Sequence, residues 1–138
     1  MSHRRRIHDA DYQRLLTVRT GLRRFQRWSA DQAAAHGLTA SQHQLLLAIR
    51  GHDEPQGPTI GQVADYLLIR HHSAVELIDR TERLGLILRS RDPEDHRAVR
   101  LKLDDHGTQI LETLTSAHLE ELERLTALLE TLASTLTV

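Results

Sequence analysis

The stretch TIGQVADYLLIRHHSAVELIDRTERLGLILRSRDPEDHRAVRLKL, residues 59–103, decides the fold of this chain. Its beginning predicts a short helix, because Thr59 can cap the free N–H groups and Gln62 stands where a capping box requires it. A second helix is predicted over residues 70–85, where apolar side chains recur at helical spacing. The face expected to be buried comprises Ala74, Leu77, Ile78, Thr81 and Leu84.

A basic hairpin is predicted directly after the second helix. Gly85 can turn left-handed and end the helix, and Leu86 can supply the hydrophobic contact that often follows such a cap. The segments LILRSRD and AVRLKL flank the turn PEDHR, and apolar residues alternate with Arg100 and Lys102 in the second segment. A short strand near residues 58–60 is expected to pair with this hairpin. Helix, turn, helix and basic hairpin in this order predict a winged helix-turn-helix, whose usual task is reading duplex DNA.

Three segments of the sequence resemble the MarR (multiple antibiotic resistance regulator) family. GLILRSRDPEDHRAVRLKLDDHG is similar to the family's wing, and LIRHHSAVELIDRTERLGLI to the recognition helix of one of its branches. LTASQHQLLLAI is similar to the preceding helix, where Thr39 and Gln42 predict another capping box. The resemblance covers nearly the whole chain, and the wing motif is its specific part. It implies a mainly α fold with a small β-hairpin, in which a single chain (residues 1–138) carries a winged helix-turn-helix over residues 39–103.

Two long amphipathic segments flank the winged region. Residues 7–36 predict one helix that ends at Gly37 and carries arginines around an apolar stripe. The stripe comprises Leu15, Val18, Leu22, Phe25 and Trp28. Residues 104–138 predict a helical region capped by Asp104, with leucines at the spacing of a helix–helix seam from Leu122 to Leu136. The sequence leaves open whether this region is one bent helix or two. We expect both segments to be dimerisation helices that interleave with those of a second subunit, as the resemblance also implies.

Composition places the chain among ordinary single-domain globular proteins. Its 138 residues are 39% hydrophobic and 27% charged, and no apolar run approaches the roughly 18 to 20 residues of a membrane span. The basic N-terminus has no apolar core of a secretory signal. The absence of cysteine excludes disulfides and thiol-based redox sensing and fits a reducing compartment. We therefore expect a cytoplasmic protein, located at the nucleoid when bound to DNA.

Charge is strongly segregated along the sequence although the net charge is only −1. Residues 1–30 hold eight arginines against two aspartates, and residues 70–102 hold eight basic residues against six acids. Residues 103–138 hold one arginine against seven acids. This asymmetry indicates that different surfaces face different partners, of which double-stranded DNA is the expected one.

The first turns of the second helix carry the side chains expected to read base edges. These candidates are Arg70, His71, His72, Ser73 and Glu76. Arg70 can pair with guanine, and a histidine can donate or accept according to its tautomer. Ser73 can bind a phosphate or cap the helix. Glu76 can accept from cytosine or pair with Arg80 four residues on, and we favour the intrahelical pair. The alternative for the two histidines is a polar helix start without base contact.

The hairpin carries the candidates for backbone and minor-groove contacts. They are Arg89, Arg91, Asp95, Arg97 and Arg100. A guanidinium at the wing tip, Arg97, suits the narrow and electronegative minor groove. The resemblance implies that a carboxylate at Asp95 holds this arginine, and that a second basic residue is commoner where this chain has His96. The other arginines are assigned to the outward faces of the strands, where they would contact phosphates.

The resemblance further implies a small aromatic or anionic effector, bound in a crevice between the dimerisation helices and the winged region. Tyr12, Trp28 and His118 are candidates to line that crevice. Two subunits would then present two recognition helices to a pseudo-palindrome with half-sites about 10 bp apart. Repression is the mode expected from the resemblance, with effector binding releasing the DNA by a population shift.

Other classes of function are weaker interpretations of the same residues. No metal site is predicted, because His36, His43, His106 and His118 lack recognisable zinc spacing, and zinc sensing remains an alternative within the family. An enzyme is not expected, since the chain has no cysteine nucleophile and no phosphate-binding glycine loop, and no cofactor is implied. A winged protein-interaction module without DNA is the last alternative, and the arginine-bearing wing argues against it.

Overall fold

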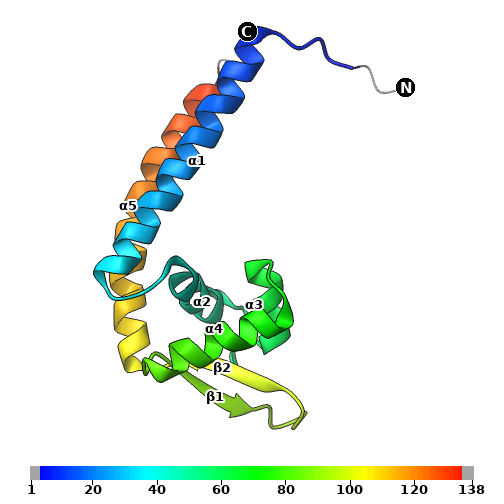
Figure 1. Cartoon of the computed structure of the whole chain (residues 1–138), viewed down its shortest axis with the longest axis vertical. Coiled ribbons are helices and arrows are strands. Elements are labelled where there is room, and N and C mark those ends of the chain that lie inside the picture. The colour runs from blue at the N-terminus through cyan, green and yellow to red at the C-terminus, as the bar shows by residue number, and fades with distance from the viewer. Residues whose placement is uncertain (1–3, 135–138) are drawn as a thin grey trace.

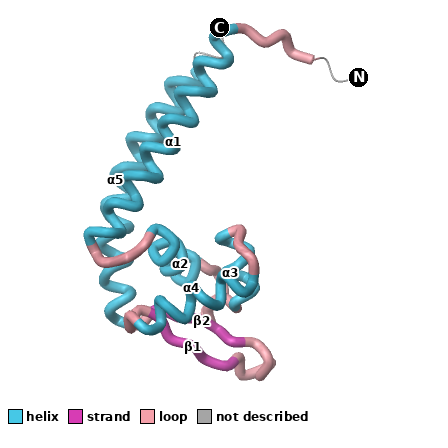
Figure 2. The backbone as a smooth tube through the Cα atoms, viewed as in Figure 1, coloured by secondary structure: helices cyan, strands magenta, loops and turns pink. Residues whose placement is uncertain are grey.

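The computed structural model describes residues 4–134, and within this range the chain forms helices and one two-stranded hairpin. The helices are α1 (Asp9–Ala35), α2 (Ala40–Gly51), α3 (Ile60–Leu67), α4 (His71–Arg83) and α5 (Asp105–Ser134); the strands are β1 (Ile87–Arg91) and β2 (Val99–Leu103). Figure 2 shows how strongly helix dominates. The predicted fold class is therefore confirmed.

The two longest helices form an arm that stands away from the winged region. Figure 1 shows α1 and α5 running side by side in opposite directions, with α2, α3, α4 and the hairpin gathered at one end. The C-terminal region is a single helix through Ser134, which settles the question that the sequence left open for the described residues. Leu136, the last member of the predicted seam, lies outside them. None of the described helices has the length and apolar character needed to cross a membrane.

The core lies where the winged region meets the base of the arm. Its fully buried side chains come from every element of the winged region and from the start of α5. They include Leu45, Leu46, Val63, Ile78, Leu86, Ile87, Leu101 and Leu114. In α4 the predicted buried face is observed at Ala74, Ile78 and Thr81, whereas Leu84 is half exposed. Leu84 is the residue after the last helical turn, so its side chain no longer follows the buried face.

Local caps fix the helix ends as the sequence predicts. The hydroxyl groups of Thr39 and Thr59 accept from the backbone N–H of the third helical residue, and both capping boxes are complete. The carboxylate of Asp104 accepts from the Gly107 N–H at 2.8 Å and starts α5. Gly85 has φ of +72° and turns the chain from α4 into β1.

The register of the hairpin corrects one expectation. Arg89 pairs with Leu101 and Arg91 with Val99, and directly paired residues of antiparallel strands share a face. Because Leu101 is fully buried, the face that Arg89 and Arg91 share is the inward one, so the assignment of both to the outward face is wrong; Arg91 is nevertheless exposed, because it lies at the end of the strand. The expected third strand is present only as a single bridge between Thr59 and Arg100.

Candidate nucleic-acid interface

The start of α4 presents free polar side chains. Arg70 is the residue before the helix, with extended backbone, and His71 and His72 form its first turn. All three are exposed, and within residues 4–134 no hydrogen bond or ion pair engages their side chains. Ser73 does not cap the helix, so of its two expected roles only phosphate contact stays open. These donors are available to an external partner.

Glu76 lies one turn further along α4 and is paired within the helix. Its carboxylate lies 3.9 Å from the guanidinium of Arg80, at the i, i+4 spacing, and both side chains are about two-thirds exposed. The preferred sequence interpretation, an intrahelical pair, is observed. Such an exposed pair contributes little to stability, roughly 0.3 to 0.5 kcal/mol, so either partner can exchange it for another contact.

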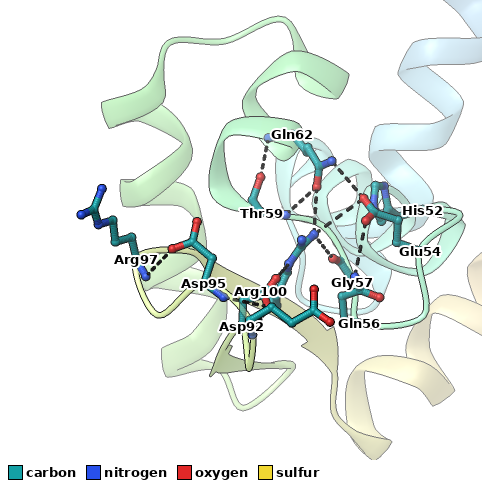
Figure 3. A network of polar contacts seen from close by, with 11 residues as sticks. His52, Glu54, Gln56, Gly57, Thr59, Gln62, Asp92, Asp95, Arg97 and Arg100 are labelled. Atoms are coloured by element: carbon teal, nitrogen blue, oxygen red, sulfur yellow. Dashed lines mark hydrogen bonds and ion pairs between the residues drawn. The ribbon is translucent and has the colours of Figure 1, made fainter.

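The turn between the strands is built by two aspartates. The Asp92 carboxylate accepts from the N–H groups of Glu94 at 2.8 Å and Asp95 at 3.3 Å. The Asp95 carboxylate accepts from the backbone N–H of Arg97 at 3.1 Å, as Figure 3 shows. The expectation that Asp95 holds the guanidinium of Arg97 is therefore replaced by a contact to its backbone. The Arg97 side chain projects from the tip without an ion pair in the described part of the chain.

Arg91 lies at the end of β1 and remains exposed. Its guanidinium donates to the carbonyl oxygen of His96 at 3.3 Å, across the turn. Together with Arg97 it gives the tip two cations that reach solvent.

Arg100 has a different position from the one expected. Only 13% of its side chain is exposed. Its guanidinium donates to Asp92 at 2.9 Å and to the Gly57 carbonyl at 3.1 Å, and lies 3.7 Å from Glu54 (Figure 3). The prediction of an outward phosphate contact is wrong for Arg100, because the loop after α2 covers it. The hydrogen bonds from the Glu94 N–H and from Arg100 hold the pKa of Asp92 below its usual value.

Arg89 is likewise engaged by protein groups. Its guanidinium donates to Glu82 at 2.9 Å and also to Asp79, so it joins β1 to the second half of α4. This ion pair lies on the inward face established by the strand register. Arg89 and Arg100 therefore hold the wing, whereas Arg91, Arg97 and Lys102 remain exposed at its surface.

A second polar cluster, which the sequence analysis missed, lies beside the Arg100 network. His52 contacts the Tyr66 hydroxyl at 2.7 Å through Nδ1 and Glu54 at 2.9 Å through Nε2. His52, Asp53 and Glu54 bring three metal-ligating atoms near one another. Both imidazole nitrogens are already engaged, however, and the cluster serves as a polar link between the loop and α3. Hydrogen bonds from Gln62 and His52 lower the pKa of Glu54. The adjacent letters HDE in a loop were the only signal in the sequence.

A cavity of about 640 Å³ lies between the arm and α2. It is lined by Leu22, Phe25, Gln26, Ser29, Ala40, His43, Gln44, Leu47, Thr115, His118, Leu119, Leu122 and Leu125. Of the three predicted crevice residues, His118 is in this lining. The ring of Trp28 packs at a tilt against that of His118, with centroids 4.8 Å apart, while Tyr12 is exposed near the start of α1 and does not line the cavity. Of the four histidines weighed as metal ligands, His43 and His118 come together here, whereas His36 and His106 are exposed.

The helices α3 and α4 followed by an arginine-tipped hairpin make this a winged helix-turn-helix protein. Free polar side chains lie at the start of its second helix, α4. Residues 36–98 match the model of the MarR family. The match lies in the helix-turn-helix and wing, and it confirms the resemblance of the sequence to the MarR family.

Comparison with individual proteins agrees with this assignment. The chain is 31% identical over 85 residues to YkoM, an uncharacterized HTH-type transcriptional regulator of Bacillus subtilis (strain 168), over 60% of this chain and 52% of YkoM. The chain spans about half the length of the curated relatives it matches. The S. aureus MepR–DNA complex is similar with a TM-score of 0.70 and 20% identity, over 96% of each chain. A mutant MarR from E. coli complexed with operator DNA is similar with a TM-score of 0.66 and 21% identity, over 88% of this chain and 91% of that one. These structures share the fold.

Proposed function

We propose that this chain is a transcriptional regulator that binds a specific DNA sequence as a homodimer, with repression as its mode. The observation that carries the proposal is the set of free polar side chains at the start of α4, next to the wing. A helix in the major groove reads bases with its first turns, which here carry Arg70, His71 and His72. The exposed guanidinium of Arg97 at the wing tip suits the minor groove.

Known proteins of the same fold support this proposal. S. aureus MepR and a mutant E. coli MarR have both been solved with DNA, and YkoM is described as an HTH-type transcriptional regulator. By the same reasoning Arg91 is the second wing cation expected at a phosphate, while Arg89 and Arg100 support the wing from within.

The arm supports the proposal of a homodimer. Large apolar side chains remain exposed along α1 and α5 in the single chain. Those that do not line the cavity between the arm and α2 include Tyr12, Leu15, Leu16 and Leu128. Large apolar side chains exposed along two neighbouring helices are typical of a protein interface, and two helices with matching stripes favour a second copy. A two-fold pair would present two α4 helices to half-sites about 10 bp apart.

The cavity between the arm and α2 supports release by a small aromatic or anionic effector. Its walls belong both to the arm and to the winged region, so a ligand there would change how the two are placed relative to each other. Binding that favours one spacing of the paired α4 helices over another would shift the population away from the DNA-bound form.

A fluorescence-anisotropy titration tests the proposed function. The protein is titrated against random duplex and against duplex selected from a random pool, each at two salt concentrations. We expect tight binding to the selected duplex and a steep loss of affinity with salt on both, because phosphate contacts release counterions. Weak binding that salt does not alter would exclude a DNA-binding regulator.

A further inference from the structure

Three consecutive apolar residues, Leu67, Leu68 and Ile69, stand where α3 ends and the chain turns into α4. Leu67 packs against the hydrophobic core, and Ile69 lines the groove between the start of α2 and α4. Leu68 lies between them and points to solvent: it is 91% exposed, the highest value among the large hydrophobic residues of the described chain. Its side chain therefore contributes almost nothing to the packing of the winged region.

The backbone of Leu68 is also unusual. Its φ is +55° and its ψ is +43°, the left-handed conformation, and within residues 4–134 every other residue with positive φ is a glycine. A β carbon disfavours this conformation, which glycine or asparagine adopts more readily at the end of a helix. The chain thus carries a leucine where the side chain neither packs nor suits the backbone. Such an outlier points to a use outside the folded chain.

Hydrogen bonds hold this turn in one position. The Leu68 N–H donates to the Asp65 carbonyl oxygen at 3.3 Å, and the Ile69 N–H donates to the Ala64 carbonyl oxygen at 3.1 Å. Both bonds close the last turn of α3, so the backbone of Leu68 has a fixed place relative to the start of α4. A side chain presented from a fixed turn loses little backbone freedom when it contacts a partner.

Leu68 lies beside the side chains proposed to read bases. It precedes Arg70 by two residues and His71, the first residue of α4, by three. In Figure 1 the end of α3 and the start of α4 lie on the side of the winged region away from α1 and α5, so the arm proposed to pair two subunits lies elsewhere. A partner at Leu68 is therefore the partner of the α4 start, which under the proposed function is duplex DNA.

The edges of the base pairs in the major groove are polar except for one apolar feature, the 5-methyl group of thymine. We propose that Leu68 reads a thymine through that methyl group, at a base pair next to those read by Arg70 and the first turn of α4. The inference deepens the proposed function and rests on it. It makes Leu68 a residue that determines sequence specificity from outside the recognition helix.

Uracil is thymine without the methyl group, so a thymine-to-uracil scan of the selected duplex isolates the contact. Each thymine is replaced singly, and fluorescence anisotropy gives the dissociation constants of the wild type and of Leu68→Asn, which accepts the left-handed backbone but offers no apolar side chain. For the wild type we expect the dissociation constant to rise about fourfold at one thymine of each half-site, the effect of one methyl group buried from water. For Leu68→Asn the same replacement should have no effect.

Two further variants separate the contact from an effect on folding. Leu68→Gly removes the side chain and relieves the left-handed backbone, so it should keep the wild-type stability in urea while losing the preference for thymine over uracil. Leu84→Asn alters an exposed leucine directly after α4 and should keep that preference. A marked loss of stability in Leu68→Gly would show that the leucine serves the fold, and would overturn the inference.

The results also distinguish this inference from the proposed function. If no uracil replacement weakens the wild type, or if Leu68→Asn and Leu68→Gly retain the effect, the thymine contact is wrong and DNA binding stands. An equal loss of affinity by both variants on every duplex, with the thymine preference retained, would indicate a contact to the sugar–phosphate backbone and would overturn it as well. Absence of binding to any duplex would contradict the proposed function itself, and this inference with it.

Discussion

At the scale of single residues, the wing contains two kinds of arginine that look alike in the sequence. Arg89 and Arg100 are held by carboxylates of α4, of the turn and of the loop after α2. Arg97 extends from the tip with no such partner in the described residues, and Arg91 contacts only a carbonyl oxygen. Charge alone does not tell these roles apart, because the carboxylates come from elsewhere in the chain.

Replacing Arg97 by alanine should weaken DNA binding on all sequences and lower the logarithmic salt slope by about 1, the loss of one phosphate-region contact. Anisotropy titrations of the variant on selected and random duplexes measure both effects. Arg100→Ala serves as the contrast, since it leaves Asp92 without its partner and should cost about 3 kcal/mol of folding free energy. An Arg97→Ala protein with unchanged affinity and slope would show that the tip does not touch DNA.

Replacing Arg70 by alanine should instead change which sequence is preferred. Arg70 is exposed directly before the first turn of α4, where a bidentate contact to guanine discriminates by about 1 to 3 kcal/mol. Selection of duplexes by the variant and by the wild type, compared position by position, measures the effect, and His72→Ala is expected to act at a different position. Identical DNA-sequence preferences for the wild type and both variants would show that α4 does not read bases.

At the scale of elements, the sequence predicted features that depend on local signals and missed those that depend on long-range contacts. The capping boxes at Thr39 and Thr59 and the turn at Gly85 lie within a few residues of the ends they define, so those ends were predicted correctly. The inward position of Arg89 was not, because it depends on the strand register and on Asp79 and Glu82 of α4. The covering of Arg100 depends on Gly57, far along the chain.

The same distinction between local and long-range features holds for the candidate site. The start of α4 and the wing tip follow from the order of the motifs, and the structure places both at the surface. The contact between the rings of His43 and His118 could not be found, since α3, α4 and the hairpin separate α2 from α5 in the sequence.

The hairpin turn should give the protein an acid-sensitive element at Asp92. The pKa of Asp92 is lowered in the folded chain, so its contribution to stability is complete above its ordinary pKa of 3.8 and is lost as the pH falls below that value. Asp92→Asn should therefore destabilise the protein at pH 7 and have less effect at pH 3. Urea unfolding of both proteins at the two pH values measures this difference, and an equal loss at both would contradict the assigned role.

At the scale of the whole molecule, we expect the arm and the winged region to have separate tasks. The arm of α1 and α5 leaves leucines exposed that a second copy would cover, while the winged region carries the free cations. The acids of residues 103–138 lie mostly on α5, away from the wing, and thus keep negative charge off the proposed DNA surface.

Placing a charge on the arm should separate the subunits. Leu16 is 64% exposed in the single chain, so Leu16→Glu should leave the fold intact and raise the dimer dissociation constant at least tenfold by burying a carboxylate. Sedimentation velocity measures the change, with Leu84→Glu, at an exposed leucine outside the arm, as the control. An unaltered sedimentation coefficient would place the dimer interface elsewhere.

Paired subunits that set α4 and the wing on one duplex are the central claim. Selection of bound duplexes from a random pool, followed by sequencing, tests it most directly. The claim predicts enrichment of an inverted repeat with half-sites about 10 bp apart. Recovery of unenriched sequence, or of a single half-site without its inverted partner, would contradict it.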